Sequence, residues 1–469
     1  WEKAVALKDQ VPGLILVRFS PPGTPAEEGV VDFASALMAQ PEDHLTFGAP
    51  RSGKDVAAYF HTGGTTGVPK LVTHTHRSQL VASFGGAAMC GYTQDDIITA
   101  TFPLFHVAGT IAVGLCAFMA GSELVIMTPA GLRNPAVVEG FWRLVEQYKP
   151  TLLGGVPTAL GAVLQVPVGD HDISSVRAGL TGAALLPPAV GARFREVTGT
   201  KLYEVLGMTE ASGLISYDPP SGPGGVGSVG WALPYTRADV LRLEADGSLG
   251  DVCEPREIGV IAIRGEHVSP GYKDPAHNQG VFADGLLNSG DLGYKDEEGR
   301  LYVAGRSKDL IIRSGHNIDP AMIENTMATH PDVVLAAAVG APDAYAGELP
   351  VCFVELRPGA EVSDADLHAH AQAGIDERPA WPKQIYRIDT IPLTTVGKIY
   401  KPSLRCDAAR HKITQLLHEE MGLPGARVDV AEGGARGMRV TVTLAADDKA
   451  SAGAVEKALA DFLFEARVE

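Results

Sequence analysis

Short apolar segments alternate with a helical segment in the first third of the chain, and this alternation constrains the fold more than any other feature. Residues 123–127 form an apolar run, residues 136–148 have a helical pattern, and residues 150–153 are apolar again. A strand, a helix and a strand at this spacing are typical of right-handed βαβ units, in which the strands are parallel. We therefore expect an α/β protein with a mostly parallel sheet in this region.

A charge-free stretch at residues 102–120 raises the alternative of a membrane span, because it contains no Asp, Glu, Lys or Arg. The stretch also contains Pro103, His106 and glycine residues, and no basic residue lies close to either end. These features favour a loop followed by a buried helix. We therefore expect no transmembrane span.

The remaining segments predict two further kinds of structure. Residues 221–230 are rich in Gly and Pro and are typical of a loop. Asp-Gly or Glu-Gly pairs at 246–247, 284–285 and 298–299 then predict a β-rich part built from hairpins. After Arg306 a mixed pattern predicts a small α+β domain. Its expected elements are helices at 320–329 and 363–373 and strands at 333–339, 351–356 and 384–387.

Length and composition limit the function. The chain has 469 residues, 45% of them hydrophobic, which at about 100–200 residues per domain predicts several folded domains and excludes a disordered protein. Its net charge of −17 argues against a broad surface for nucleic acid or anionic membranes, so we expect no nucleic-acid partner. Five cysteines are scattered without CxxC spacing, which favours unpaired thiols in the reducing cytoplasm.

A loop rich in Gly and Thr reads HTGGTTGVPK at residues 61–70. Glycines allow backbone N–H groups to approach an anion, threonine hydroxyls donate to phosphate oxygens, and Lys70 supplies positive charge. The pattern indicates a phosphate-binding loop, although Pro69 breaks the ending of a Walker A motif, and a plain glycine turn is the alternative. A second glycine motif, at residues 225–230, lacks a preceding strand and is followed by Pro234, so we expect no dinucleotide site there.

Three further clusters combine residues that suit a nucleotide. Thr209 and Glu210 could hold Mg²⁺ together with phosphate oxygens, or they could begin a helix as its cap and first-turn acid. Asp291 could bind a ribose diol and Arg306 a ribose or phosphate oxygen, or both could belong to ordinary turns. Lys398 follows Thr-Thr-Val-Gly in a turn, where a solvated surface charge is the alternative.

In this order, the segments resemble the acyl-adenylate-forming superfamily, which includes acyl-CoA synthetases, luciferases and the adenylation domains of peptide synthetases. The resemblance runs from about Val56 to Lys401, and RSGHNIDP at residues 313–320 is similar to the acyl- and aryl-CoA ligase branch. It implies an α/β fold with a large N-terminal domain of several subdomains, made of mixed sheets, helices and a β-rich part, over residues 1–306. It also implies a small mobile α+β domain over residues 307–410, which turns about a hinge at Lys308.

The resemblance implies a nucleotide site and a role for each of its residues. The loop from Thr62 would handle the β- and γ-phosphates, and Asp291 would take the ribose hydroxyls with support from Arg306. Leu206 stands where family members commonly have an aromatic residue that stacks on adenine, so weaker stacking is expected. The implied nucleotide-binding residues are Thr62, Gly63, Gly64, Thr65, Thr66, Gly67, Lys70, Gly182, Ala183, Ala184, Leu206, Asp291 and Arg306.

The resemblance also implies the catalytic residues and the acyl pocket. Lys398 would be the catalytic lysine of adenylation, Glu210 would help to hold Mg²⁺, and Thr209 would lie near the α-phosphate. His106 would lie at the gate between the acyl and CoA channels, with a satisfied core histidine as the alternative. The implied acyl-pocket residues, none of them acidic or a Lys or Arg, are His106, Val107, Gly155, Gly182, Gly207 and Met208.

The implied function is that of an AMP-forming acyl-CoA synthetase, an acid–thiol ligase that uses ATP, Mg²⁺ and coenzyme A and no prosthetic group. A pocket without charge indicates a carboxylic acid with an apolar end, and a fatty acid is favoured over an aryl or alicyclic acid. The alternatives are an acyl-AMP ligase that loads a carrier protein, a luciferase-type oxygenase, and a non-catalytic ligase-like binding protein. The expected location is cytoplasmic, and a homodimer is left open.

Both ends of the chain depart from the length that the resemblance implies. The phosphate loop begins at about residue 62, whereas a substantial stretch of sheet and helix precedes it in related enzymes. We therefore expect the N-terminal domain to lack its start. At the other end, residues 411–469 are expected to form an extension of unknown role, with a strand–strand–helix unit over residues 427–469.

Overall fold

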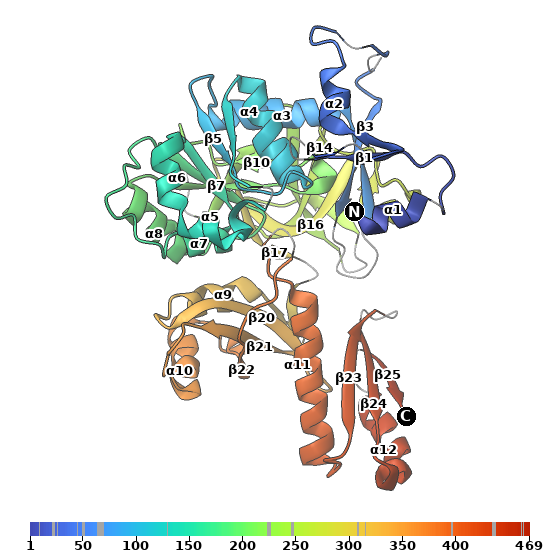
Figure 1. Ribbon diagram of the computed structural model, residues 1–469. Coiled ribbons are helices and arrows are strands. Elements are labelled where there is room, and N and C mark those ends of the chain that lie inside the picture. The colour runs from blue at the N-terminus through green and yellow to red at the C-terminus, as the bar shows by residue number, and fades with distance from the viewer. Residues whose placement is uncertain are drawn as a thin grey trace. The chain divides into compact units, whose positions relative to one another are not determined.

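The structure is a computed structural model (Figure 1). Its described residues form two compact units, residues 1–55 and residues 56–469. The described residues are 1–8, 10–20, 24–25, 27–44, 46–48, 52–62, 70–128, 130–222, 227–244, 248–306, 309–314, 316–394, 397–433, 438–460, 462 and 464–469.

The first unit is small and mostly exposed. Strands β1 (Leu16–Arg18) and β2 (Val30–Asp32) pair in parallel, with α1 (Glu2–Lys8) before them and α2 (Phe33–Met38) after them. The Asp32 side chain caps α2 by accepting a hydrogen bond from a backbone N–H in its first turn. Leu16 is the single buried residue among the described residues of this unit, so they enclose little hydrophobic core.

The second unit is built around a long mixed sheet, one half of which is parallel. The strands of this half lie in the order β6-β5-β7-β8-β9, and each neighbouring pair is parallel. The predicted strands near residues 123–127 and 150–153, and the parallel arrangement, are therefore confirmed. The bounds are β5 (Ile97–Ala100), β6 (Glu123–Ile126), β7 (Leu152–Gly155), β8 (Ala178–Gly182) and β9 (Leu202–Leu206).

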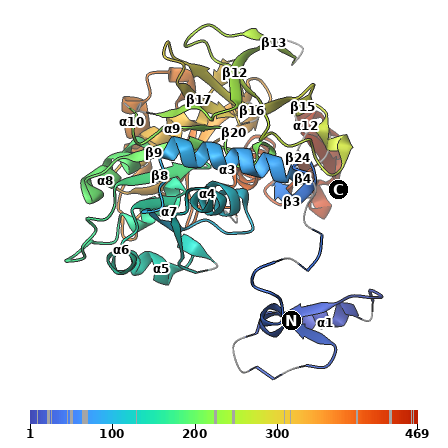
Figure 2. The same cartoon turned by 90° about the horizontal axis from the view of Figure 1, so that it is seen from above.

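Helices cover both faces of the parallel half, which explains why its strands are apolar on both sides. On one face α3 and α4 pack together, and Ala117 of α4 shares a hydrophobic core with Leu152 of β7 (Figure 2). On the other face α5, α6, α7 and α8 share a core in which Trp142 lies with Leu153. The bounds are α3 (His76–Cys90), α4 (Cys116–Ala120), α5 (Pro135–Glu139), α6 (Phe141–Tyr148), α7 (Pro157–Val163) and α8 (Pro188–Thr198).

The charge-free stretch at residues 102–120 belongs to this core. It forms a loop, the π-helix η1 (Ala108–Leu115) and then α4, and Ile111 and Cys116 are fully buried. The prediction of a loop followed by a buried helix is confirmed. Within the part of the chain that the structure describes, no helix combines the length and the apolar character that crossing a bilayer requires.

The other half of the long sheet is antiparallel and contains the hairpins predicted at residues 284–285 and 298–299, whereas residues 246–247 lie outside the described residues. It continues from β9 in the order β10-β11-β17-β16-β14-β12-β13, and β15 pairs with β16. The bounds are β10 (Ser216–Tyr217), β11 (Ser228–Ala232), β12 (Thr236–Leu243), β13 (Leu249–Val252), β14 (Gly259–Gly265), β15 (Phe282–Ala283), β16 (Leu286–Lys295) and β17 (Leu301–Arg306). The described end of the second glycine motif, residues 227–230, runs into strand β11.

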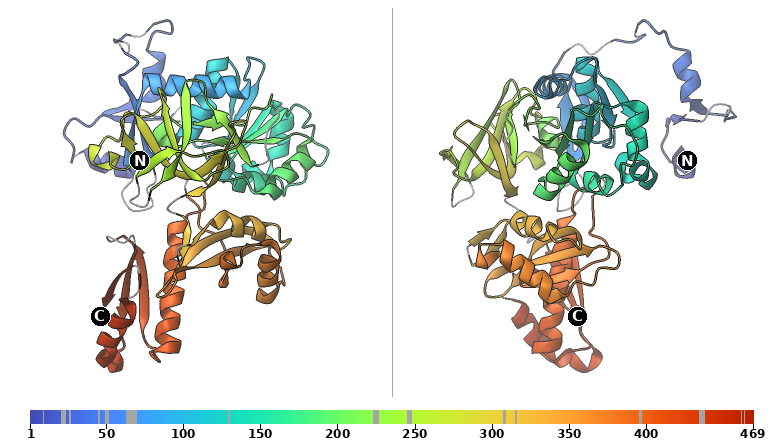
Figure 3. Two further views of the ribbon diagram at one scale, coloured as in Figure 1. Left: turned by 180° about the vertical axis from the view of Figure 1, so that it is seen from behind. Right: turned by 90° about the vertical axis from the view of Figure 1, so that its left-hand side faces the viewer.

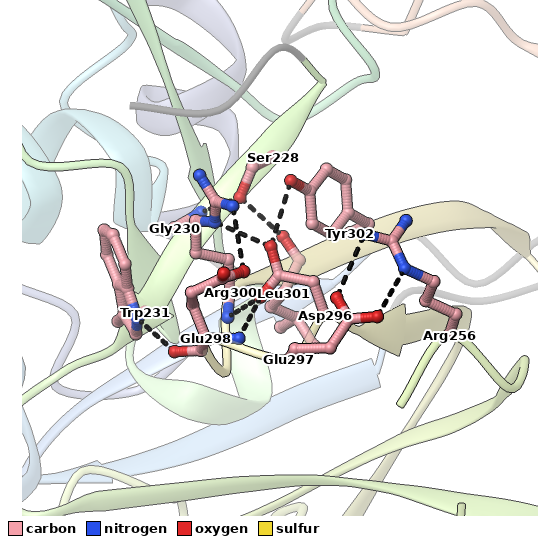
Figure 4. A network of polar contacts seen from close by, with 10 residues as sticks. All are labelled: Ser228, Gly230, Trp231, Arg256, Asp296, Glu297, Glu298, Arg300, Leu301 and Tyr302. Carbon is pink, nitrogen blue, oxygen red and sulfur yellow. Dashed lines mark hydrogen bonds and ion pairs between the residues drawn. The ribbon is translucent and has the colours of Figure 1, made fainter. Parts of the chain in front are cut away.

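A polar network fastens the turn between β16 and β17 (Figure 4). Buried Asp296 accepts hydrogen bonds from the side chain and the backbone of Arg300, at 2.6 Å and 2.8 Å. The indole N–H of Trp231 donates to the carbonyl of Glu298 at 3.1 Å, and Gly299 takes the positive φ that the turn requires. The hairpin predicted at residues 298–299 is therefore present, and it is tied to the neighbouring strand β11.

The small α+β part follows β17 and has a sheet of its own. Its strands lie in the order β19-β18-β21-β20, with β22 parallel to β21, and hydrophobic cores that include α9 and α11 cover this sheet. All five elements expected between residues 320 and 387 are present. The bounds are β18 (Ile311–Arg313), β19 (His316–Ile318), α9 (Pro320–Ala328), β20 (Val333–Asp343), β21 (Gly347–Leu356), α10 (Asp364–Gly374) and β22 (Gln384–Arg387).

The C-terminal extension forms a separate three-stranded sheet beside a long helix (Figure 3). Strands β23 and β24 form the expected hairpin, and α12 follows them. A fourth element, β25, pairs in parallel with β24 and was not part of the predicted strand–strand–helix unit. The bounds are α11 (Lys401–Gln415), β23 (Arg427–Glu432), β24 (Met438–Thr443), α12 (Ala452–Leu459) and β25 (Glu465–Val468).

Candidate active site

Glu210 lies in a tight turn between β9 and β10, where the parallel half of the sheet meets the antiparallel half. Thr209 and Glu210 are both buried in a single 3₁₀ turn, so they do not begin an α-helix. The turn is compact because Gly207 approaches Gly213 closely: a Cβ atom on Gly207 would lie 1.9 Å from the Gly213 carbonyl oxygen. A buried carboxylate on a rigid turn is thus placed at the junction of the two half-sheets.

Tyr272 connects this carboxylate to the strand that follows the phosphate loop. Its phenolic O–H donates to Oε1 of Glu210 at 2.6 Å, and the Lys70 ammonium lies 5.2 Å from the centre of its ring. Burial, together with the negative charge of Glu210, raises the pKa of Tyr272 well above its ordinary value, so the phenol remains a donor. Tyr272 was not among the predicted site residues. The sequence does contain a signal for it: Tyr272 directly follows a Pro-Gly pair, and the O–H of a buried tyrosine usually needs a hydrogen-bond acceptor.

His74 ties strand β4 (Lys70–Thr75) to the same turn. It is fully buried, its Nε2 lies 2.8 Å from the carbonyl oxygen of Thr209, and burial lowers its pKa. A neutral imidazole with its proton on Nε2 donates this bond. Strand β4 pairs with β3 (Val56–Thr62) so that Thr62 lies opposite Lys70. The predicted loop residues Gly63, Gly64, Thr65, Thr66 and Gly67 lie outside the described residues.

Asp291 and Arg306 face each other across the β16–β17 hairpin. The two residues are paired in register, and Nε of Arg306 donates to Oδ1 of Asp291 at 2.9 Å. Burial raises the pKa of Asp291, while the positive charges of Arg306 and Lys398 act in the opposite direction. The predicted support of Asp291 by Arg306 is thus a direct contact in the structure.

Lys398 lies at the end of a small hairpin between β22 and α11. The Lys398 N–H donates to Oγ1 of Thr394 at 3.1 Å, and the Thr394 N–H donates to the Lys398 carbonyl at 2.7 Å. Burial and the charge of Arg306 lower the pKa of Lys398 to about 8, whereas the charges of Asp291 and Glu210 raise it. The charges of three predicted site residues therefore shift the pKa of Lys398, although these residues are 92 to 188 positions away in the sequence.

One hydrogen bond docks this hairpin on the large sheet. The hydroxyl of Thr158, in the first turn of α7, donates to the carbonyl oxygen of Gly397 at 2.9 Å. Gly397 has φ of +81°, and a Cβ atom there would lie 3.0 Å from Val156. Glycine is needed here both for its backbone conformation and for the close approach.

His106 lies near the lysine and is neutral at physiological pH. Burial and the positive charge of Lys398, with a contribution from His61, lower the pKa of His106 to about 4. Its Nδ1 lies 3.2 Å from the backbone nitrogen of Ala108 and accepts that N–H. This leaves Nε2 to carry the proton of the ring.

Three of the predicted nucleotide-binding residues, Gly182, Ala183 and Ala184, lie at the end of β8, where the backbone is strained. Gly182 cannot hold a side chain, because a Cβ atom would lie 2.7 Å from the Val205 carbonyl oxygen. Ala183 then takes φ of +71°, which is unusual for a residue other than glycine, and Ala184 follows it. Leu206 and Met208 pack against the core of the antiparallel half.

A narrow pocket of about 30 Å³ separates the lysine hairpin from the parallel half of the sheet. Gly155, one of the predicted acyl-pocket residues, lines it together with Leu132 and Gly397. Val107 belongs instead to a buried core between β3, α3 and η1. Arg133 also borders the pocket and was not among the expected lining residues, which included no Asp, Glu, Lys or Arg.

Lys308, the predicted hinge residue, lies outside the described residues, but the next residue, Asp309, makes two polar contacts. The Arg405 guanidinium of α11 lies 3.0 Å from the Asp309 carboxylate, and the Asp309 N–H donates to the Arg306 carbonyl at 2.9 Å. The chain leaving β17 is therefore tied both to the nucleotide site and to α11.

The structure has a long sheet that is half parallel and half antiparallel, followed by a small α+β part, and charged groups gather where these parts meet. These features define an adenylate-forming enzyme. The sequence agrees with this class: residues 8–273 match the AMP-binding enzyme family and residues 322–398 match the AMP-binding enzyme C-terminal domain. The chain belongs to the AMP-binding enzyme family. Within it, the relatives place the chain in the branch of the AMP-forming acyl-CoA synthetases, which are acid–thiol ligases.

The relatives cover different shares of the chain. The marinolic acid–CoA ligase of Pseudoalteromonas sp. (strain SANK 73390) is 38% identical over 95% of this chain, which spans 69% of that protein. The long-chain-fatty-acid–CoA ligase of Bacillus subtilis (strain 168) is 33% identical over 79% of this chain, which spans 65% of that protein. The solved o-succinylbenzoate coenzyme A synthetase of Bacillus subtilis, in complex with ATP and magnesium ion, has a TM-score of 0.68 and 28% identity over 86% of this chain and 81% of its own.

Proposed function

We propose that this chain joins a carboxylic acid to CoA in two half-reactions at the site described above. In the first, a carboxylate oxygen attacks the α-phosphorus of ATP, the bond to the β-phosphate oxygen breaks, and acyl-AMP and pyrophosphate form. In the second, the CoA sulfur attacks the acyl carbonyl carbon and AMP leaves. The observation that supports this proposal most strongly is the arrangement of Glu210, Asp291, Arg306 and Lys398 around one point of the fold.

Lys398 is proposed to serve the first half-reaction. Two anions must meet there, so positioning and charge stabilisation are the main needs. A flexible ammonium can contact both the carboxylate and the α-phosphate, and Asp291 would hold the ribose hydroxyls while Arg306 orients its carboxylate. Thr209 would lie near the α-phosphate, and Lys70 with the loop from Thr62 would bind the outer phosphates.

Glu210 is the proposed protein ligand for a Mg²⁺ ion that arrives with ATP. Mg²⁺ prefers one or two carboxylates and phosphate oxygens, and it would neutralise charge on the phosphates. The residues present fit this role because Tyr272 occupies Oε1 of the buried Glu210 carboxylate and thereby sets its orientation. Within the described ranges no group of three or more His, Cys, Asp or Glu forms a self-contained metal site.

The second half-reaction is proposed to need movement of Lys398 away from the reacting carbonyl. We propose that residues 307–410 act as a mobile domain on residues 1–306, with the hinge at Lys308, and that residues 411–469 move with the smaller domain. This movement would break the hydrogen bond from Thr158 of α7 to the Gly397 carbonyl, and the one from Arg357 to Gln165. His106 would lie at the gate that the CoA thiol passes.

The proposed acid is one with an apolar end, and a fatty acid is favoured. Small and aliphatic residues such as Gly155 and Leu132 line part of the pocket beside Gly397, which Arg133 also borders, and two relatives are ligases for marinolic acid and for long-chain fatty acids. Aryl and alicyclic acids are the alternative substrates, and a carrier protein is the alternative acceptor to CoA. A cytoplasmic location is proposed because all five cysteines are free thiols.

ATP–pyrophosphate exchange over a panel of carboxylic acids tests this function. We expect exchange with medium- or long-chain fatty acids, and acyl-CoA formation when CoA is added. Lys398→Ala should reduce exchange by about a thousandfold, because it removes charge stabilisation in the transition state, and should largely spare the reaction of supplied acyl-AMP with CoA. The matched control is Lys383→Ala, which removes an exposed lysine of the small domain. Undiminished exchange in Lys398→Ala would contradict the assignment.

A further inference from the structure

A hydrogen bond joins the C-terminal extension to the hairpin that carries Lys398. The phenolic oxygen of Tyr400, two residues after Lys398, lies 2.7 Å and 2.9 Å from the two carboxylate oxygens of Glu432 on β23. The phenol donates and the carboxylate accepts. This contact raises the pKa of Tyr400 to about 12, so the phenol keeps its proton over the working pH range.

Tyr400 is also the base of the lysine hairpin. Its N–H donates to the Pro392 carbonyl at 2.8 Å, and Leu393 and Ile399 form the bridge just above. Lys398 lies beyond this bridge. A restraint on the Tyr400 side chain therefore limits the directions in which the whole hairpin, and its ammonium group, can point.

The other end of the restraint is firmly held, because α11 is packed on two sides. Leu404 and Ala408 share a hydrophobic core with the β20–β21 pair. Further along α11, Ile413 shares a second core with Val428 of β23 and with the rest of the extension. The strand that carries Glu432 is thus fixed to the same helix that begins directly after Tyr400, as Figure 1 and Figure 3 both show.

We propose that Glu432 is a positioning residue for adenylation: by holding Tyr400, it orients the hairpin so that Lys398 faces the nucleotide. This inference rests on the proposed function, in which Lys398 acts in the first half-reaction. It gives the extension a catalytic purpose, since the extension supplies the carboxylate from outside the part that matches the family. The 38% identical relative matches 95% of this chain, a share that must include most of the extension.

The test compares Glu432→Ala and Tyr400→Phe with the control Asp429→Ala, which removes an exposed carboxylate from the same strand. In the two test variants, kcat for ATP–pyrophosphate exchange should fall roughly three- to tenfold, because a partly exposed hydrogen bond to a charged group is lost. KM for ATP, and the conversion of supplied acyl-AMP with CoA, should not change. Glu432→Gln keeps an acceptor and should restore most of the rate, and the double variant should be no slower than either single one.

An unchanged kcat for ATP–pyrophosphate exchange in Glu432→Ala and Tyr400→Phe would overturn the inference. An equal fall in both half-reactions would also overturn it, because that result indicates a purely structural role. Hydrogen exchange of the Lys398 and Tyr400 amides separates this inference from the proposed function. Faster amide exchange in Glu432→Ala supports the link to the hairpin. If the wild-type chain is inert with every acid but the amides exchange faster in Glu432→Ala than in the wild type, only the proposed function is overturned. If amide protection is the same in both, the link to the hairpin is overturned.

Discussion

Two hairpins supply charged groups to the candidate active site, and they are held in different ways. The β16–β17 hairpin, with Asp291 and Arg306, lies inside the long sheet and is fastened at its turn by the buried Asp296 network. The Lys398 hairpin lies outside that sheet, and its Gly397 carbonyl accepts a hydrogen bond from Thr158 of α7. The hairpin with Asp291 and Arg306 is therefore part of the long sheet, whereas the lysine belongs to the small α+β part, which is proposed to move.

Among the variants that follow, Asp291→Ala on the fixed hairpin should have the largest effect. It removes two hydrogen bonds proposed for ribose and leaves Arg306 without its carboxylate, so we expect both half-reactions to slow by about a hundredfold. This separates the fixed hairpin from the mobile one, since Lys398→Ala should affect the first half-reaction alone. Single-turnover measurements of each half-reaction check it. An effect on adenylation alone would remove the proposed distinction.

Tyr272→Phe tests the support of Glu210 from the fixed side. Without the phenol, the buried carboxylate loses a short hydrogen bond, and we expect exchange to fall about tenfold and the Mg²⁺ concentration for half-maximal rate to rise. Titration of exchange with Mg²⁺ is the measurement. Tyr294→Phe, on β16, is the matched control. A normal Mg²⁺ dependence in Tyr272→Phe would show that Tyr272 does not position Glu210.

The protonation of Lys398 provides a third test. Its pKa is lowered to about 8, so the ammonium is present below that pH and is lost above it. We expect kcat/KM of the exchange reaction to fall roughly fivefold between pH 8 and pH 9, because kcat/KM reports the free enzyme and only about half of its Lys398 side chains are protonated at pH 8. Lys398→Arg, although slower, should lack this fall since arginine stays charged. The same fall in Lys398→Arg would assign the titration to another group.

Thr158→Val removes the hydrogen bond between α7 and the lysine hairpin and should have the smallest effect. It removes the hydroxyl that donates to the Gly397 carbonyl while keeping the side-chain volume, so adenylation should slow about threefold with no loss in the second half-reaction. Thr198→Val removes a hydroxyl from α8 as a control. A larger loss in the second half-reaction than in the first would reverse the proposed role of this contact.

Much of the fold could be predicted from the sequence where apolar periodicity is strong. The strands around residues 123–127 and 150–153 appear as expected, but the predicted helix at 136–148 is two helices, because Gly140 interrupts it. The last helix ends at Leu459, and Phe462 and Phe464 then pack into the extension core before β25. These boundaries depend on tertiary packing, which a local pattern does not contain.

The charged residues of the candidate site could be predicted from the sequence, but the residues that hold them by hydrogen bonds could not. Asp291 and Arg306 lie side by side, and the charges of both shift the pKa of Lys398. Tyr272 and Glu432 were missed because each acts through a hydrogen bond to a residue distant in sequence, and neither stands in a recognisable spacing. Such partners become visible only when the register of strands and the packing of helices are known.

The double packing of α11 has a consequence for anyone who cuts this chain into fragments. The expected boundary between residues 410 and 411 falls inside α11, five residues before its end at Gln415. A fragment that stops there would lose Ile413 and would unravel the last turns of the helix, whereas one that stops after Gln415 would leave Ile413 without the extension core. The small α+β part and the extension should therefore be expressed, labelled and crystallised as one piece.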